Sequence, residues 1–170
     1  LGLAEEFLRT SRAEMIDTAR FEELDFGGLL HQAVDDAFAG ARAKSVHLVR
    51  ALPDEPVWVN GEFGLLHRAM LNLVQNAVHY APSGSEVRIA LTVEAGHALA
   101  SVTDRGPGIA AEDQARLFQR FTRATGQGSG TGLGLYFVRT VAEKHGGTAA
   151  VRSAPGETTC FTLKLPLAAH

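Results

Sequence analysis

The chain has 170 residues, of which 45 % are apolar, so it can form one domain of ordinary size around a buried core. Its formal net charge of −3 at pH 7 gives no bulk reason to bind nucleic acid or an anionic membrane. The single Cys160 excludes an internal disulfide framework and fits a reducing compartment. We expect no signal peptide and no membrane-spanning helix in this sequence, because no apolar run approaches the roughly 20 residues that span a bilayer.

The first 19 residues predict a helix, because they contain no proline and their only glycine is Gly2. Six positions follow the alternating three-and-four spacing of a coiled-coil seam, although half of them are small or polar, so a partner helix stays open. These positions are Leu1, Ala4, Leu8, Ser11, Met15 and Thr18. Because the chain begins at Leu1 rather than at a methionine, we expect it to be part of a longer protein.

The next segment predicts a short extended piece, a second helix and two short strands. Residues 24–26 are extended and end at Gly27-Gly28, and the helix follows from about 29 to 43. The inward positions of this helix are Leu30, Val34, Ala37 and Phe38. Residues 46–50 and 57–59 predict strands on either side of a turn-forming Pro-Asp-Glu-Pro segment.

A central helix begins after Gly61 and ends near Tyr80, and the second half of the chain predicts mainly strands. The apolar stripe of the central helix is Leu66, Met70, Leu73 and Ala77. Clean alternation predicts a half-buried strand at 86–93, with a partner at 99–103 and a closing hairpin over 148–165. The inward residues of these strands are Val87, Ile89, Leu91, Val93, Phe161, Leu163 and Leu165.

With a further helix over about 133–145, the elements predict an α/β two-layer sandwich of about three helices on one mixed, mainly antiparallel sheet. Cys160 alternates with Phe161 on the last strand, so we expect a small core residue rather than a nucleophile.

Two carboxamides of the central helix are the first candidates for a binding site. An α-helix turns about 100° per residue, so Asn72, Asn76 and His79 lie within about 60° of one another. An Asn oxygen is a neutral, hard ligand that suits Mg²⁺ already carrying phosphate oxygens and water. The alternative is that Asn72 only caps or hydrogen-bonds a neighbouring loop.

The segment Asp104-Arg105-Gly106-Pro107-Gly108 follows a predicted strand directly. A carboxylate there can accept a hydrogen bond from the amino group of adenine, whereas guanine presents a carbonyl at that position. The two glycines leave room for the backbone to turn and approach a flat ring closely. The alternative is an ordinary turn initiated by Asp104.

The glycine-rich segment 128–135 opens a predicted helix, where exposed N–H groups and the helix dipole favour phosphate. Thr131 adds a hydroxyl donor, and the alternative is a flexible linker. Between the two glycine-rich segments, Phe118 and Phe121 predict either a core-packing turn or the hinge of a mobile lid. Arg120 and Arg123 either reach a phosphate or lie on a solvated face.

Together these segments resemble the histidine-kinase branch of the GHKL nucleotide-binding superfamily, and the resemblance covers about residues 24–165. The order of the four motifs is that of the family: an N box at 72–76, a G1 box at 104–108, an F box at 118–121 and a G2 box at 130–134.

The resemblance implies that this chain binds ATP and Mg²⁺, with Asn76 as the metal ligand and Asn72 supporting the metal and phosphates. Asp104 would contact adenine, and the backbone of 132–134 would hold the phosphates. The implied catalytic residues are Asn72 and Asn76. The implied nucleotide-binding residues are Asn76, His79, Tyr80, Asp104, Gly106, Gly108, Ile109, Phe121, Thr131, Gly132, Leu133 and Gly134. Relatives usually carry Lys or Arg at the position of His79, which leaves its phosphate contact open.

The N box also indicates the reaction. GHKL ATPases place a Glu four residues before the metal ligand, but this chain has Asn72 there, which cannot act as a general base. Phosphoryl transfer to a histidine of another domain therefore fits better than hydrolysis. No histidine of the chain has the sequence context of a phosphoacceptor. A GHKL ATPase and a non-catalytic ATP sensor or pseudokinase are the alternatives.

The resemblance also implies an organisation and partners. Residues 1–20 would end a dimerisation helix or form a linker, and 21–170 would form the ATP-binding catalytic domain. The partners would be ATP, the dimerisation and phosphoacceptor domain of the parent kinase and, through the parent, a response regulator; no nucleic acid is expected. The location would be cytoplasmic, with the parent either free or anchored in the inner membrane, and the oligomeric state stays open.

Overall fold

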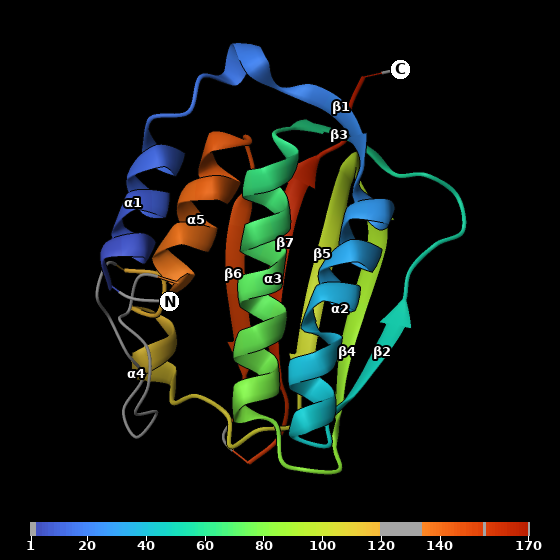
Figure 1. Cartoon of the computed structure of the whole chain (residues 1–170), viewed down its shortest axis with the longest axis vertical. Helices are drawn as coiled ribbons and strands as arrows, with labels where there is room; N and C mark the ends of the chain where they lie inside the picture. Colours follow the sequence, from blue (N-terminus) through green and yellow to red (C-terminus); the bar gives the residue numbers. More distant parts are fainter. Residues whose placement is uncertain (1–2, 120–133, 155, 170) are drawn as a thin grey trace.

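The computed structural model describes residues 3–119, 134–154 and 156–169. A five-stranded sheet forms one layer, and helices cover one of its faces (Figure 1). The first part of the chain forms α1 (Leu3–Glu14), a 3₁₀ turn (Thr18–Arg20), β1 (Glu22–Asp25), α2 (Phe26–Ala43), β2 (His47–Ala51), β3 (Trp58–Gly61) and α3 (Phe63–Tyr80). The second part forms β4 (Glu86–Glu94), β5 (His97–Asp104), α4 (Ala111–Gln114), α5 (Gly134–Lys144), β6 (Thr148–Ser153) and β7 (Thr159–Pro166).

The sheet has the order β2-β4-β5-β7-β6. β2 runs parallel to β4, and the remaining pairs are antiparallel. β1 and β3 form a separate antiparallel ribbon. Helices α2, α3 and α5 lie over the sheet, and α1 lies beside α5 (Figure 1). The predicted two-layer α/β sandwich with a mixed, mainly antiparallel sheet is confirmed.

The core lies between α3 and the sheet. Helical spacing in α3 and strict alternation in β7 predicted its inward residues. Leu66, Met70, Leu73 and Ala77 are at most 1 % exposed, and so are Phe161, Leu163 and Leu165. Two predicted core residues are wrong, since Phe38 and Val93 are each 54 % exposed. Phe38 lies roughly 80° around α2 from Leu30, and Ala41 completes the buried stripe instead. Val93 lies beyond the last residue of β4 that pairs with β2.

The N-terminal boundaries also differ from the prediction. α1 ends at Glu14 rather than near residue 19, and the seam residues Leu8 and Met15 are exposed while Ala13 is buried. α2 begins at Phe26 and includes the glycines that were expected to end an extended segment. The reason is Asp25, whose Oδ1 accepts hydrogen bonds from the backbone N–H of Gly27 and from that of Val57, both at 3.1 Å.

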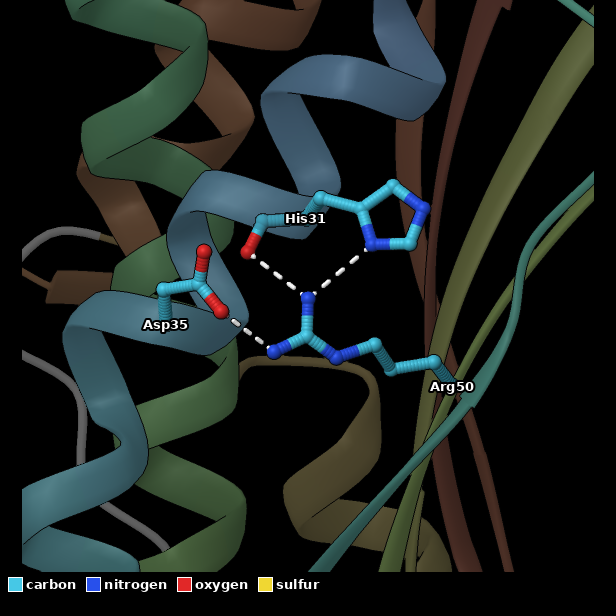
Figure 2. Close-up of polar contacts among 3 residues, drawn as sticks. All are labelled: His31, Asp35 and Arg50. Atoms are coloured by element: carbon cyan, nitrogen blue, oxygen red, sulfur yellow. Dashed lines mark hydrogen bonds and ion pairs between the residues drawn. The ribbon is translucent and has the colours of Figure 1, made fainter. Parts of the chain in front are cut away.

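Arg50 fastens the edge strand β2 to α2 (Figure 2). Its Nη1 donates to His31 Nδ1 at 2.9 Å and to the His31 carbonyl oxygen at 3.2 Å, and its Nη2 donates to Asp35 Oδ1. Because a guanidinium only donates, His31 accepts through Nδ1. The contact is largely exposed, so it orients the strand more than it stabilises the domain.

His145, which follows the last residue of α5, joins the C-terminal end of this helix to the start of α3. Its Nδ1 donates to the Val141 carbonyl oxygen at 2.7 Å, and its Nε2 accepts from the backbone N–H of Glu62 at 3.1 Å. Its ring stacks on Phe21, with ring centres 4.3 Å apart. Burial lowers the pKa of His145, which favours the neutral imidazole. In this form one ring nitrogen donates and the other accepts, as the two hydrogen bonds require.

Cys160 is only half-buried, because it lies on the opposite face of β7 from Phe161. The prediction that it is a core residue is therefore wrong.

The two glycines after α5 have separate structural reasons. Gly146 has a φ of +76°, and the Gly146 and Gly147 N–H groups donate to the carbonyl oxygens of Glu143 and Ala142, which is a Schellman C-cap. Gly147 also lies against β7, where a Cβ would be 1.9 Å from the Lys164 carbonyl oxygen. Gly146 therefore caps the helix, and Gly147 is required because a side chain would have no space.

We predict that Gly147→Ala lowers the free energy of unfolding by about 1–3 kcal/mol, because a backbone atom must move. The matched control is Gly40→Ala, which lies on α2 with no atom within 4 Å of the added methyl group. The control should be neutral or gain up to about 1 kcal/mol from helix propensity. Denaturant unfolding measures both, and equal stabilities would contradict the packing at Gly147.

Candidate functional site

The predicted site residues come from three elements whose relevant ends lie in the lower half of Figure 1. These are the C-terminal end of α3, the segment that follows β5, and the N-terminal end of α5. Packing of α3 on the sheet places the first two, because its apolar stripe fixes both the rotation and the depth of the helix.

Helix α3 carries the predicted metal and phosphate residues. Glu62 caps its start, since Oε2 accepts from the Leu65 N–H at 2.6 Å. Asn72 and Asn76 are half-buried on this helix, as residues at the edge of its apolar stripe should be. His79 is exposed and meets the half-buried Tyr80 edge to face, with ring centres 4.7 Å apart.

Asp104 ends β5 as a buried carboxylate, only 3 % exposed. Its Oδ1 accepts a hydrogen bond from the Gly106 N–H at 2.8 Å. Burial raises the pKa of Asp104, whereas the hydrogen bond from Gly106 and the positive charge of Lys44 lower it. A carboxylate kept in such surroundings has acceptor capacity that a donor of a ligand can use.

Gly106 lies in close contact with both the β5 end and the α3 end. A Cβ at this position would be 2.8 Å from Asp104 Oδ1 and 2.9 Å from the Tyr80 carbonyl oxygen. Gly108 has a φ of +80°, which favours glycine. The backbone of this segment therefore comes as near to α3 as the absence of side chains allows.

The G1 segment, residues 104–109 after β5, is held by hydrogen bonds to Ser153 at the end of β6, and the sequence did not predict these bonds. The Ile109 N–H donates to Ser153 Oγ at 2.9 Å, and Gln114 Nε2 donates to the carbonyl oxygens of Ile109 and Ser153 at 2.7 and 2.8 Å. Ile109 itself is 5 % exposed. Neither Ser153 nor Gln114 belongs to a motif, so no signal in the sequence singled them out.

Lys44 is a second residue that sequence reasoning missed. Its Nζ donates to the Val78 carbonyl oxygen at 2.9 Å and to the His79 carbonyl oxygen. A lysine just after a helix commonly caps that helix. No local pattern predicts that Lys44 caps a different helix, at a residue 34 positions later.

The remaining predicted residues divide into two groups. Phe118 packs edge to face on Phe161 with ring centres 6.0 Å apart, so the core-packing interpretation is confirmed for this aromatic. Gly134 is the first residue of α5. The other predictions lie outside the described residues: Arg120, Phe121, Arg123, Thr131, Gly132 and Leu133.

A family profile described as "Histidine kinase-, DNA gyrase B-, and HSP90-like ATPase" matches residues 61–169, more than half of the chain. The chain belongs to this ATPase family. The matched residues include α3, the G1 segment and α5, so the site residues named above lie within the family match.

Curated relatives of this ATPase family place the chain in its sensor-kinase branch. It is 38 % identical over 173 residues to the sensor histidine kinase TrcS of Mycobacterium tuberculosis, covering 97 % of this chain and 33 % of TrcS. It is 37 % identical over 176 residues to the sensor protein IrlS of Burkholderia pseudomallei, covering 95 % of this chain and 38 % of IrlS. The chain spans about a third of the length of these relatives.

Solved structures agree with this placement. The mycobacterial sensor histidine kinase MprB matches with a TM-score of 0.75 and 29 % identity, over 88 % of this chain and all of that one. Full-length ShkA, solved in complex with AMPPNP, matches with a TM-score of 0.86 and 27 % identity, over 99 % of this chain and 36 % of that one. The chain therefore corresponds to the ATP-binding catalytic domain of sensor histidine kinases.

No described helix has the length and apolar character needed to cross a bilayer. Nor do the described residues contain three or more His, Cys, Asp or Glu side chains grouped to hold a metal ion.

We predict that Gly106→Ala weakens ATP binding about tenfold, because the added methyl group must displace either the Asp104 carboxylate or the end of α3. Isothermal titration calorimetry with ATP measures the effect. Gly40→Ala, which adds a methyl group in open space on α2, should bind ATP as the unaltered domain does. Unchanged ATP binding by Gly106→Ala would contradict this placement of the site.

Proposed function

We propose that this domain binds Mg²⁺–ATP and transfers the γ-phosphoryl group to a histidine on a separate dimerisation domain of its parent kinase. The observation that carries the proposal is Asp104: a buried carboxylate at a strand end, with Gly106 packed between it and α3. The complex of the relative ShkA with AMPPNP supports an adenine nucleotide as the ligand.

The residues present fit such a nucleotide. Asp104 uses Oδ1 for the Gly106 N–H, so Oδ2 is the oxygen that would accept from the exocyclic amino group of adenine. Gly106 leaves the space that a Cβ would fill beside both Asp104 and Tyr80. The same carboxylate disfavours guanine, whose carbonyl would face it.

Asn76 would hold Mg²⁺ through its side-chain oxygen, and Asn72 would support the metal and phosphates from the preceding turn of α3. When bound, Mg²⁺–ATP supplies the transferable phosphoryl group, with the metal neutralising part of its charge. The N-terminal end of α5 at Gly134 offers N–H groups and a positive dipole to phosphate. Thr131, Gly132, Leu133 and Phe121 stay predictions from the family resemblance.

The reaction we propose is transfer and not hydrolysis, because Asn72 stands where a general base would be needed to activate water. A carboxamide accepts no proton at neutral pH. The domain then contributes positioning and electrostatic stabilisation, and the nucleophile comes from the acceptor histidine.

We further propose that 21–170 is the catalytic domain and that 1–20 ends a dimerisation helix or linker. Tyr136 of α5 donates to Glu14 Oε2 at 3.2 Å, and α1 packs along α5, which supports contact between such a helix and the nucleotide-binding domain. The dimerisation and phosphoacceptor domain, and a response regulator acting through the parent, are the proposed partners.

We predict that Asp104→Asn weakens ATP binding about 10- to 100-fold and reduces the preference for ATP over GTP, because the amide presents donors as well as an acceptor. The ligand-free variant should unfold at the same or a higher temperature, since burial penalises the charged form that it replaces. Nucleotide titration and thermal unfolding measure both effects. Asp54→Asn, in the exposed turn after β2, is the control. Equal ATP affinity of Asp104→Asn and the unaltered domain would refute this role.

We predict that Asn76→Ala loses most of the gain in ATP affinity that Mg²⁺ provides, whereas Gln75→Ala, the exposed neighbour on α3, keeps it.

We also predict that the unaltered domain phosphorylates a supplied helical acceptor domain of its parent while it hydrolyses little ATP alone. Radiolabelled phosphotransfer and phosphate release measure these activities. Rapid hydrolysis by the isolated domain would favour a GHKL ATPase. ATP binding without phosphotransfer would favour a non-catalytic sensor, for which the exposed His79 is the motivating residue.

A further inference from the structure

The C-terminal end of α3 is completed by a side chain from another helix. The last carbonyl oxygens of a helix have no partner within the helix. Here the Ala77 carbonyl oxygen accepts from the Ala81 N–H at 2.9 Å, and those of Val78 and His79 both accept from Lys44 Nζ. A positive charge at this end also interacts favourably with the helix dipole.

The last turn of α3 also packs against the G1 segment at Gly106. The Tyr80 carbonyl oxygen, one residue after the second acceptor of Lys44, limits the space at Gly106, where a Cβ would be 2.9 Å away. Gly106 in turn donates to Asp104 at 2.8 Å. A shift of this turn of α3 would therefore change the surroundings of the carboxylate.

Lys44 also acts on Asp104 through its charge. It lowers the pKa of Asp104, against the effect of burial. Other titratable groups on the adjoining elements are Arg105 beside Asp104, Tyr80 and His79 on α3, Arg88 on β4, and Cys160 on β7 with Arg152 opposite it on β6. The largest effect of a charge on the pKa of Asp104 comes from Lys44.

The ammonium group of Lys44 is available for this role. Among the described residues, no carboxylate lies within 4 Å of its Nζ, so its described bonds go to the main chain of α3. The turns after α2 and α3 are separately joined, because the Gly84 N–H donates to the Ser45 carbonyl oxygen at 2.7 Å and the His47 N–H to that of Ser85 at 2.9 Å. We therefore expect the fold to survive removal of the lysine head group, because these main-chain hydrogen bonds remain.

We propose that Lys44 is a positioning residue of the nucleotide site: its ammonium group fixes the last turn of α3 and supplies the positive charge near the buried Asp104 carboxylate. The proposal deepens the function proposed above and rests on Asp104 as the adenine contact. Lys44 itself touches neither the nucleotide nor the metal in this role.

The first test reads Asp104 directly, without nucleotide. Titration of the Asp104 side-chain carboxyl carbon by NMR compares the unaltered 170-residue chain with Lys44→Met, Lys44→Arg and the control Lys164→Met, an exposed lysine on β7. Lys44→Met should raise the pKa of Asp104, because a nearby positive charge is lost. Lys44→Arg and Lys164→Met should leave it in place. An Asp104 titration that is the same in Lys44→Met and the unaltered chain overturns the proposal.

The second test measures ATP affinity between pH 5 and pH 8. Lys44→Met should raise the Kd about fivefold at neutral pH, and the loss of binding on acidification should begin at a higher pH than in the unaltered chain. Lys44→Arg should restore both. Uniform weakening at all pH values, with no shift of this acid limb, would show a purely structural role and overturn the proposal. Failure of the proposed function is distinct: Asp104→Asn would then bind ATP normally, while the NMR titration would still report on Lys44.

Discussion

The burial of one face of α3 against β4 and β5 is the constraint on which the site depends. Leu66, Met70 and Leu73 are at most 1 % exposed, and each contributes about 1.5–3 kcal/mol on burial. An apolar stripe fixes the rotation of a helix, so the same packing that forms the core directs Asn72 and Asn76 to its edge. It also brings the Tyr80 carbonyl oxygen close to Gly106. Core and site are therefore set by a single packing arrangement.

Hydrophobic period predicted the parts of the fold that local pattern controls. The stripe on α3 and the alternation on β7 are buried as expected, because each lies in the middle of an element with neighbours on both sides. The errors occur at margins, where burial depends on which element happens to cover a residue. Phe38 lies at the edge of the buried stripe of α2. Val93 lies on β4, beyond the last residue that pairs with β2. The glycines at the start of α2 misled for another reason, since the cap by Asp25 outweighs their low helix propensity.

For the site, the motifs indicated the residues that are expected to touch a nucleotide but not those that support them. Asp104 and Gly106 are brought together because they are two residues apart on one turn. Lys44 and Ser153 act across 34 and 44 residues, and Gln114 acts across 39 residues to Ser153 and across 5 to Ile109. The long-range pairings depend on the tertiary fold, which no local pattern encodes. Gln114 and Ile109 are near in sequence, but a glutamine in a four-residue helix gives no pattern to recognise.

The imidazole of His145 makes one joint of the domain sensitive to acid. It stacks on Phe21, in the connection from α1, and it receives the N–H of Glu62 at the entrance to α3. Because burial lowers its pKa in the folded state, the unfolded chain binds a proton more readily. The contribution of the neutral His145 to the free energy of unfolding is present above about pH 6.5. It is lost as the pH falls through the lowered pKa that His145 has in the folded state. Acidification thus weakens the contact that holds the N-terminal segment, at the end of α3 opposite to Tyr80.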